Sequence, residues 1–274
     1  MSKLKVALLF AGQPRFITNP YTYSSHKREI LDKYTFDVFA HCWFDKDAAQ
    51  FSYNEWSRMD NCPVNPEAIN IIKNQYSPHV LKVDKPQTFS LSDKSRAIVD
   101  GSFPNNPVFN ERNVGNALSY LYSLEKVAEA YERSEKMFPD DKHDFVIVSR
   151  FDSIIYRLPD LTKLNSDHFY LSDHHPNWPD LLFICGPKYV KGLKCFSNVD
   201  KIIEGNLRHG ESFGEQIKAI NMTTHCREMW AAGDKTCSIQ PVPLPVRIVR
   251  DLAGKGDEDA LGRYGLTNEE RFVS

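Results

Sequence analysis

Three short apolar runs, each followed by a polar turn, constrain the fold of this chain most strongly. They are Lys5–Phe10, Phe36–Trp43 and Asp144–Ser149. Continuous apolar runs of this length are typical of parallel strands that are buried on both faces. The runs therefore predict a sheet whose central strands are covered by helices on either side.

Helical segments connect these runs. Residues 23–33 have a polar helical pattern, and a second helix is expected to begin with Asn65 as N-cap and Pro66 as its first residue. A short strand, His79–Val83, follows it. The order strand-helix-strand-helix-strand predicts one α/β domain with a mostly parallel, Rossmann-like sheet.

The rest of the chain is less regular. Residues 85–112 are rich in Ser, Asp, Asn and Pro and predict a functional or partly disordered loop, before a helix over 113–137. The second half predicts a mixed, loop-rich region. No linker separates it from the first half, so a single domain over 1–274 is expected, with a nucleotide-binding half (1–152) and a sugar and acceptor half (153–274). Its expected strands are 168–171 and 181–185, its expected helices are 187–204 and 210–223, and a Pro-rich tail covers 240–249.

Composition and charge argue against nucleic-acid-binding and membrane-spanning classes of protein. The 34 basic and 36 acidic side chains give a net charge of -2, which argues against a nucleic-acid partner bound on a broad basic face. No apolar run approaches the roughly 20 residues of a membrane span. The six cysteines form no C-x-x-C pair, and Cys42 and Cys185 lie in apolar runs. We therefore expect reduced thiols in the core, which are typical of cytoplasmic proteins.

Two polar motifs follow predicted strands. Ala11–Arg15 comes after the first strand and Arg150–Asp152 after the fourth. Ligands of open parallel sheets bind at the carboxyl ends of the strands. There Arg15 can form bidentate hydrogen bonds to a phosphate, and Asp152 can bind a divalent cation. Two alternatives stay open: a plain turn with a surface arginine, and a structural ion pair between Arg150 and Asp152. The G-x-G-x-x-G pattern of dinucleotide dehydrogenases is absent here.

In their order, these motifs resemble the GT-A class of glycosyltransferases, and more narrowly a family of small bacterial and viral members. The resemblance covers about the first two thirds of the chain. It rests on the Gly-Gln-x-Arg turn ending at Arg15, the D-V-F-x-H-x-W strand from Asp37 to Trp43, the helix segment Asn116–Ser123, and R-x-D. The usual motif is D-x-D, so Asp152 is implied to contact Mn²⁺ or Mg²⁺. Arg150 at the first position leaves strict metal dependence open.

The resemblance implies transfer of a sugar from a nucleoside diphosphate sugar to a glycan or other hydroxyl acceptor. Asp180 and Glu211 are the candidate catalytic bases, although Glu211 also suits a helix N-terminus as a favourable charge. The alternatives are a sugar-phosphate nucleotidyltransferase and a non-catalytic nucleotide-sugar-binding module. The candidate nucleotide-binding residues are Ala11, Gly12, Gln13, Arg15, Asn116, Ser119 and Arg150.

Overall fold

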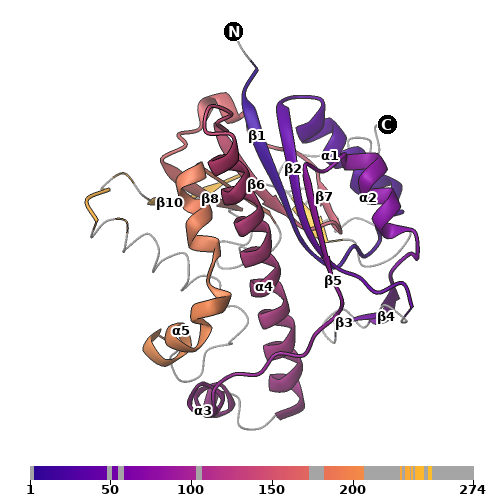
Figure 1. Ribbon diagram of the computed structural model, residues 1–274, viewed down its shortest axis with the longest axis vertical. Coiled ribbons are helices and arrows are strands. Elements are labelled where there is room, and N and C mark those ends of the chain that lie inside the picture. Colours follow the sequence, from indigo (N-terminus) through magenta and orange to yellow (C-terminus); the bar gives the residue numbers. More distant parts are fainter. Residues whose placement is uncertain are drawn as a thin grey trace.

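A computed structural model describes most of the first 206 residues and short parts of the remainder: residues 3–47, 51–54, 59–102, 107–172, 182–206, 229, 232–234, 236, 238–243 and 246–248. The described residues form an α/β fold around a seven-stranded sheet (Figure 1). The strand order is β10-β8-β9-β6-β1-β2-β5. The strands are β1 (Lys5–Gly12), β2 (Thr35–Trp43), β5 (Val80–Asp84), β6 (Phe145–Ser149), β8 (His168–Ser172), β9 (Leu182–Cys185) and β10 (Ser238–Val242).

The sheet is mostly parallel. β1 pairs in parallel with both β2 and β6, β2 with β5, and β8 with β10. β9 is antiparallel to its neighbours β6 and β8. The predicted α/β class, with a parallel first half and a mixed second half, is confirmed.

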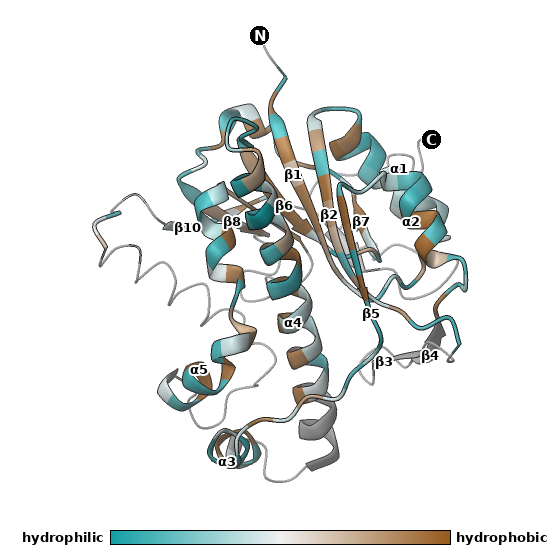
Figure 2. Ribbon diagram, viewed as in Figure 1, coloured by the Kyte–Doolittle hydropathy of each residue, from teal (hydrophilic) through white to brown (hydrophobic). Residues whose placement is uncertain are grey.

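Alternate residues of β1 face two separate cores, as the two-residue repeat of a strand requires. Leu8 and Phe10 pack with helix α2 (Ala68–Tyr76), whereas Ala7 and Leu9 pack with helix α4 (Pro107–Met137). Figure 2 shows the hydrophobic strands lying between the more polar helices. Burial on both faces explains why this run is apolar throughout.

The helix predicted for residues 23–33 begins earlier and changes type. It consists of α1 (Pro20–His26) and a π-helical turn (Lys27–Leu31). Asn19 caps α1, because its Oδ1 accepts hydrogen bonds from the backbone N–H groups of Tyr21 and Thr22 at 2.9 and 3.3 Å. Pro20 occupies the first helical position, where its missing N–H has no cost.

Two predictions about the middle of the chain were wrong. Residues 85–112 are not one loop, because α3 (Asp93–Ser102) forms there and α4 begins at Pro107. Val99 of α3 is buried against Val114 of α4, so tertiary packing stabilises a helix that composition disfavours. The helix expected from Asn65 starts at Ala68, since the Asn65 side chain accepts from the Glu67 N–H and closes a turn before it.

The helix predicted for 187–204 is also interrupted. At Ser197 the backbone N–H donates to the Glu125 carboxylate of α4 at 3.0 Å instead of to a helical carbonyl. The segment contains two 3₁₀ turns (Pro187–Leu193 and Phe196–Asn198) and then α5 (Val199–Asn206). A further 3₁₀ turn spans Leu161–Lys163.

Short strands lie outside the main sheet. β3 (Phe51–Asn54) pairs with β4 (Met59–Pro63) in the expected polar loop. The Pro-rich tail, for which no strand was predicted, contains part of β10 and all of β11 (Val246–Ile248), which pairs with β7 (Ser153–Ile155). The helix expected over 210–223 lies outside the described residues.

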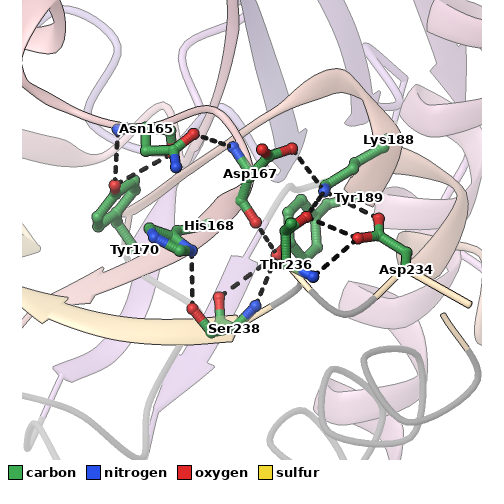
Figure 3. Close-up of polar contacts among 9 residues, drawn as sticks. All are labelled: Asn165, Asp167, His168, Tyr170, Lys188, Tyr189, Asp234, Thr236 and Ser238. Carbon is green, nitrogen blue, oxygen red and sulfur yellow. Dashed lines mark hydrogen bonds and ion pairs between the residues drawn. The ribbon is translucent and has the colours of Figure 1, made fainter. Parts of the chain in front are cut away.

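A polar cluster fastens β10 to the sheet (Figure 3). Lys188 Nζ contacts Asp167 Oδ1 at 2.8 Å and Asp234 Oδ2 at 2.9 Å. The Ser238 backbone N–H donates to the Tyr189 hydroxyl at 3.1 Å, and that hydroxyl donates to the Asp167 carbonyl at 2.7 Å. These contacts join residues that are far apart in sequence at the amino ends of β8 and β10.

Two further predictions can be compared with the described residues. Cys42, Cys185 and Cys195 are buried free thiols, as expected for core cysteines. No helix in the described part of the chain combines the length and apolarity needed to cross a membrane.

Candidate functional site

The chain adds strands to the sheet on opposite sides of β1, so the strand order changes direction between β1 and β6. From β1 the chain moves to β2 and β5 on one side, and then returns to β6 on the other side. Such a topological switch point leaves a crevice outside the carboxyl ends of its two strands, and this is where open α/β sheets bind ligands. Both polar motifs predicted from the sequence follow these two strands.

The turn after β1 has an unusual backbone. Gly12 has a φ of 115°, which other residues rarely adopt, and Phe16 has a φ of 50°, which is uncommon for a bulky side chain. Arg15 lies between them and is only 9% exposed. Two left-handed residues thus direct the chain so that a charged side chain turns inward. Ala11 is buried, and Gln13 is partly exposed.

The turn after β6 is anchored by its central residue. Phe151 is fully buried, and its ring stacks on that of Phe10 in β1, with centroids 4.7 Å apart and an interplanar angle of 14°. Arg150 and Asp152 flank this anchor. The aromatic contact therefore holds the end of β1 and the turn after β6 together from the core side.

Ion pairs connect the two turns. Arg15 Nη2 lies 2.7 Å from Asp152 Oδ2. Arg150 donates through Nε to Oδ1 at 2.8 Å and through Nη2 to Oδ2 at 2.9 Å of the same carboxylate. The Arg150–Asp152 ion pair, which the sequence left open as the alternative to a metal site, is present, whereas the Arg15–Asp152 pair was not predicted. Two guanidinium groups therefore contact one carboxylate.

The contacts of Asp152 bear on the implied metal. Its side chain is 2% exposed, and each oxygen is within 2.9 Å of a guanidinium nitrogen. A cation bound by the same oxygens would lie beside two positive charges, so Asp152 does not fit the role of a cation ligand. Across the described residues, no group of three or more His, Cys, Asp or Glu side chains could hold a metal ion.

A buried histidine lies close to Asp152. His26 is fully buried, and its Nδ1 is 2.8 Å from the Tyr76 hydroxyl. Burial lowers the pKa of His26 to about 3, although the Ser153 backbone and the Asp152 carboxylate act in the opposite direction. The ring is therefore neutral near pH 7 and adds no charge to the two arginines. The sequence does not single out His26, because nothing local marks it.

Asn116 and Ser119 lie on α4 rather than in the turns. Asn116 is exposed, and the Ser119 carbonyl accepts a hydrogen bond from Trp43 Nε1 at 3.2 Å. Trp43 is the last residue of β2, so Ser119 lies at the carboxyl edge of the sheet. The predicted contact of both residues with a nucleotide stays a prediction.

A second polar network occupies the carboxyl ends of β2 and β5. Asp84 Oδ2 lies 3.1 Å from His41 Nε2 and accepts from the Tyr122 hydroxyl at 3.0 Å, while His41 Nδ1 is 3.0 Å from Ser123 Oγ. Burial lowers the pKa of His41, and Asp84 opposes this shift. Ser123 is fully buried. An Asp–His–Ser arrangement with an inaccessible hydroxyl cannot attack a substrate, so we interpret it as structural.

The residues of the Asp37–Trp43 motif lie at opposite ends of β2. Asp37 contacts Lys5 at 2.8 Å and His143 at 3.1 Å near the amino end of β2, away from the site. His41 and Trp43 lie at the carboxyl end. The candidate bases Asp180 and Glu211 lie outside the described residues, and their assignment stays a sequence-based prediction.

The sequence was compared with protein-family models and with curated proteins. No family model matches the sequence, and a search of the curated proteins finds no match. The contacts at the switch point therefore carry the functional interpretation.

Proposed function

We propose that this chain is a cytoplasmic glycosyltransferase that uses a nucleoside diphosphate sugar. One observation carries the proposal: Arg15 and Arg150 meet at Asp152, at the switch point between β1 and β6. This is the place where α/β sheets bind nucleotides, and arginine is well suited to recognise phosphate oxygens. The sequence resemblance supports the same class of reaction.

In this proposal the donor diphosphate lies against the two arginines. Gly12, which has no side chain, lets the backbone approach the phosphates closely. Gln13, Asn116 and Ser119 are candidates for contacts to the remainder of the nucleotide. Two arginines at one point of the sheet, rather than a broad basic face, suit a small anionic ligand.

The reaction breaks the bond between the anomeric carbon and the β-phosphate oxygen. The acceptor hydroxyl oxygen forms the new bond to that carbon, and the bond electrons leave with the nucleoside diphosphate. The acceptor proton passes to a carboxylate, for which Asp180 and Glu211 are the candidates. Negative charge grows on the departing diphosphate, so fixed guanidinium groups stabilise the transition state more than the ground state.

A thermal-shift panel of nucleosides, nucleoside diphosphates and nucleotide sugars tests the proposal. A bound diphosphate compound at about 100 times its dissociation constant should stabilise the fold by roughly 2.7 kcal/mol. Turnover should release nucleoside diphosphate, whereas release of pyrophosphate would indicate a nucleotidyltransferase. Binding without turnover would indicate a non-catalytic module. Should no nucleoside diphosphate raise the melting temperature, with or without metal, the donor site is not here.

A further inference from the structure

We infer that the ring of Phe89 occupies a subsite for the acceptor, where a sugar ring takes its place and Asp84 accepts hydrogen bonds from the sugar hydroxyls. This inference rests on the proposed function, because it assigns the acceptor of that reaction to a sugar. It also places the acceptor at the carboxyl ends of β2 and β5, beside the switch point. Three ring contacts, one carboxylate and one weakly held segment carry it.

Three aromatic rings surround that of Phe89. The Phe89 ring lies 5.2 Å from the ring of Tyr122 on α4, measured between centroids, with an interplanar angle of 32°. The rings of Trp43 and Phe196 approach it at steeper angles of 62° and 70°, with centroids 5.9 and 5.0 Å away. Faces of aromatic rings carry partial negative charge, which attracts the C–H groups of a sugar ring. The rings around Phe89 therefore suit a sugar in its place.

Asp84 supplies a carboxylate beside these rings. Its Oδ2 accepts a hydrogen bond from the Tyr122 hydroxyl at 3.0 Å and lies 3.1 Å from His41 Nε2. Its Oδ1 has no hydrogen bond within the described part of the chain, and the side chain is 24% exposed. Burial raises the pKa of Asp84, but hydrogen bonds from His41 and Tyr122 outweigh burial and keep the pKa below its usual value. An ionised, oriented carboxylate oxygen is thus available to a hydroxyl donor.

The charges near Asp84 favour a neutral ligand over a cation. Lys82 lies two residues before Asp84 on β5, and its positive charge adds to the effects that lower the pKa of Asp84. Lys126 Nζ lies 5.2 Å from the centroid of the Tyr122 ring, although it also pairs with Glu129. A cationic ligand would meet these ammonium groups, whereas a sugar hydroxyl carries no charge.

The segment that carries Phe89 is weakly held. Residues 85–92 join β5 to α3 and cross in front of α4 in Figure 1. At the end of this segment the Ser92 backbone N–H donates to Asp200 Oδ1 at 3.0 Å. Residues 86–91 form no hydrogen bond with any residue that the structure describes, so side-chain packing holds Phe89 in place. Such a segment can open locally at low cost while its ends stay fixed.

The position of this subsite suits a second substrate. β2 and β5 are the next two strands after β1 in the sheet. Adjacent strands lie about 4.8 Å apart, so the carboxyl ends of β2 and β5 are about 5 and 10 Å from that of β1. A sugar in place of Phe89 therefore lies within reach of a donor at the switch point, on the side opposite β6.

Titration with the methyl β-glycosides of glucose, galactose and mannose tests the inference on the full chain. The indole N–H of Trp43, which donates to the Ser119 carbonyl, reports on the site in ¹H–¹⁵N spectra, and Trp43→Phe assigns its signal. A segment that covers the site for about nine-tenths of the time weakens the apparent affinity about tenfold. Phe89→Ala should therefore lower the dissociation constant of at least one glycoside by about tenfold. Equal dissociation constants in the two proteins, or no shift of the Trp43 signal by any glycoside, would overturn the inference.

Phe138→Ala is the matched control for Phe89→Ala. Phe138 is also partly exposed, but its ring contacts that of His79, 6.1 Å away at the amino end of β5. Its replacement should leave the dissociation constants unchanged. The same gain in affinity in both variants would mean that general loosening of the fold, not removal of the ring from the subsite, improves binding.

Asp84→Asn tests the carboxylate, made in the Phe89→Ala protein. Loss of the charged acceptor should weaken glycoside binding by about tenfold. Asp37→Asn is its matched control, because Asp37 Oδ2 likewise lies 3.1 Å from a histidine, His143, but at the opposite end of β2. Unchanged affinity in the Asp84 variant would contradict its role as the hydroxyl acceptor.

Nucleoside diphosphates distinguish this inference from the proposed function. Uridine and guanosine diphosphate should bind the natural chain and Phe89→Ala with dissociation constants that agree within about threefold, because the diphosphate lies at β1 and β6. Diphosphate binding without a glycoside response would overturn the inference and leave the proposed function intact. A glycoside response without diphosphate binding would contradict the proposed function and leave a sugar-binding site. A response to tetramethylammonium chloride but to no glycoside would assign the site to a cation and overturn the inference.

Phe89→Leu covers the case in which Phe89→Ala does not fold. Leucine keeps an apolar contact with the neighbouring rings but cannot stack on Tyr122, so the segment should open more readily. The dissociation constant of the same glycoside should fall by about threefold. An increase would mean that Phe89 contacts the sugar instead of being replaced by it, which would overturn the inference.

Discussion

The ring of Phe151 stacks on the ring of Phe10, with centroids 4.7 Å apart and planes 14° apart. Phe10 belongs to β1, two residues before Gly12, and Phe151 separates Arg150 from Asp152. The hydrophobic contact therefore fixes the distance between two turns that meet at the candidate site. If the proposed site binds a ligand, we expect the packing of these two rings to affect its affinity.

Phe151→Leu should affect both stability and binding. The smaller side chain loses the stacked contact and should lower the free energy of unfolding by about 1–3 kcal/mol. Because the turn after β6 loses its anchor, the Arg15–Asp152 pair should loosen, and diphosphate affinity should fall as well. Urea unfolding measures the first effect, and calorimetric titration at a temperature where the variant is folded measures the second.

Phe169→Leu is the matched control for this variant. Phe169 is also fully buried and contacts another ring, that of Phe183, but it lies on β8 in the core that faces α4. Its replacement should cost similar stability and leave affinity unchanged. Equal loss of affinity in both variants would mean that general destabilisation, not the position of the turn, weakens binding.

The local sequence pattern predicted the central strands, because the burial of a strand is visible in its own residues. The apolar runs of β1, β2 and β6 were recognisable because each strand is buried on both faces. The helix α3 was missed because its stability comes from α4 and α5, which no local pattern reveals. The same reason explains the site: Arg15 and Asp152 were each selected as residues at strand ends, but their ion pair depends on the sheet order.

The catalytic base can be identified by two conservative variants, Asp180→Asn and Glu211→Gln. Loss of a general base typically reduces turnover by about a hundredfold to ten-thousandfold. Loss of a favourable charge at a helix end costs under roughly 1 kcal/mol of stability and leaves turnover nearly intact. Turnover, donor affinity and melting temperature should be measured for each variant. If both turn over normally, neither residue is the base.

Lys188→Met should loosen β10 without disturbing the central strands. The variant loses the ion pairs with Asp167 and Asp234 that hold the segment before β10 (Figure 3). Amide hydrogen exchange over Ser238–Val242 should therefore become faster, while exchange in β1 should not change. Lys163→Met is the control, because Lys163 is largely exposed and its ion pair lies within one turn. Unchanged exchange in β10 would contradict an anchoring role for Lys188.

Acid should destabilise the fold through His26 at pH values where carboxylates are still ionised. The pKa of His26 is about 3 in the folded chain because the ring is buried, compared with 6.5 in an unfolded chain. Between these two pH values the unfolded state binds one more proton than the folded state. The contribution of His26 to the free energy of unfolding is therefore fully present above pH 6.5 and is lost as the pH falls towards 3. On this basis His26 alone should lower the free energy of unfolding by about 2 kcal/mol between pH 7 and pH 5.

His26→Gln separates this effect from those of other groups, because glutamine retains a polar contact for the Tyr76 hydroxyl but cannot titrate. Burial also lowers the pKa of His41 and His143, which give an acid dependence of the same sign, but both remain in the variant and cancel in the difference. Hydrogen bonds from Arg28 and Lys33 outweigh burial and hold the pKa of Glu29 below its usual value, so that carboxylate contributes only at lower pH. Urea unfolding at pH 7, 6 and 5 should therefore show a shallower pH dependence in the variant. Parallel curves for the two proteins would mean that His26 keeps an ordinary pKa, and that the ring near Asp152 adds charge to the site on mild acidification.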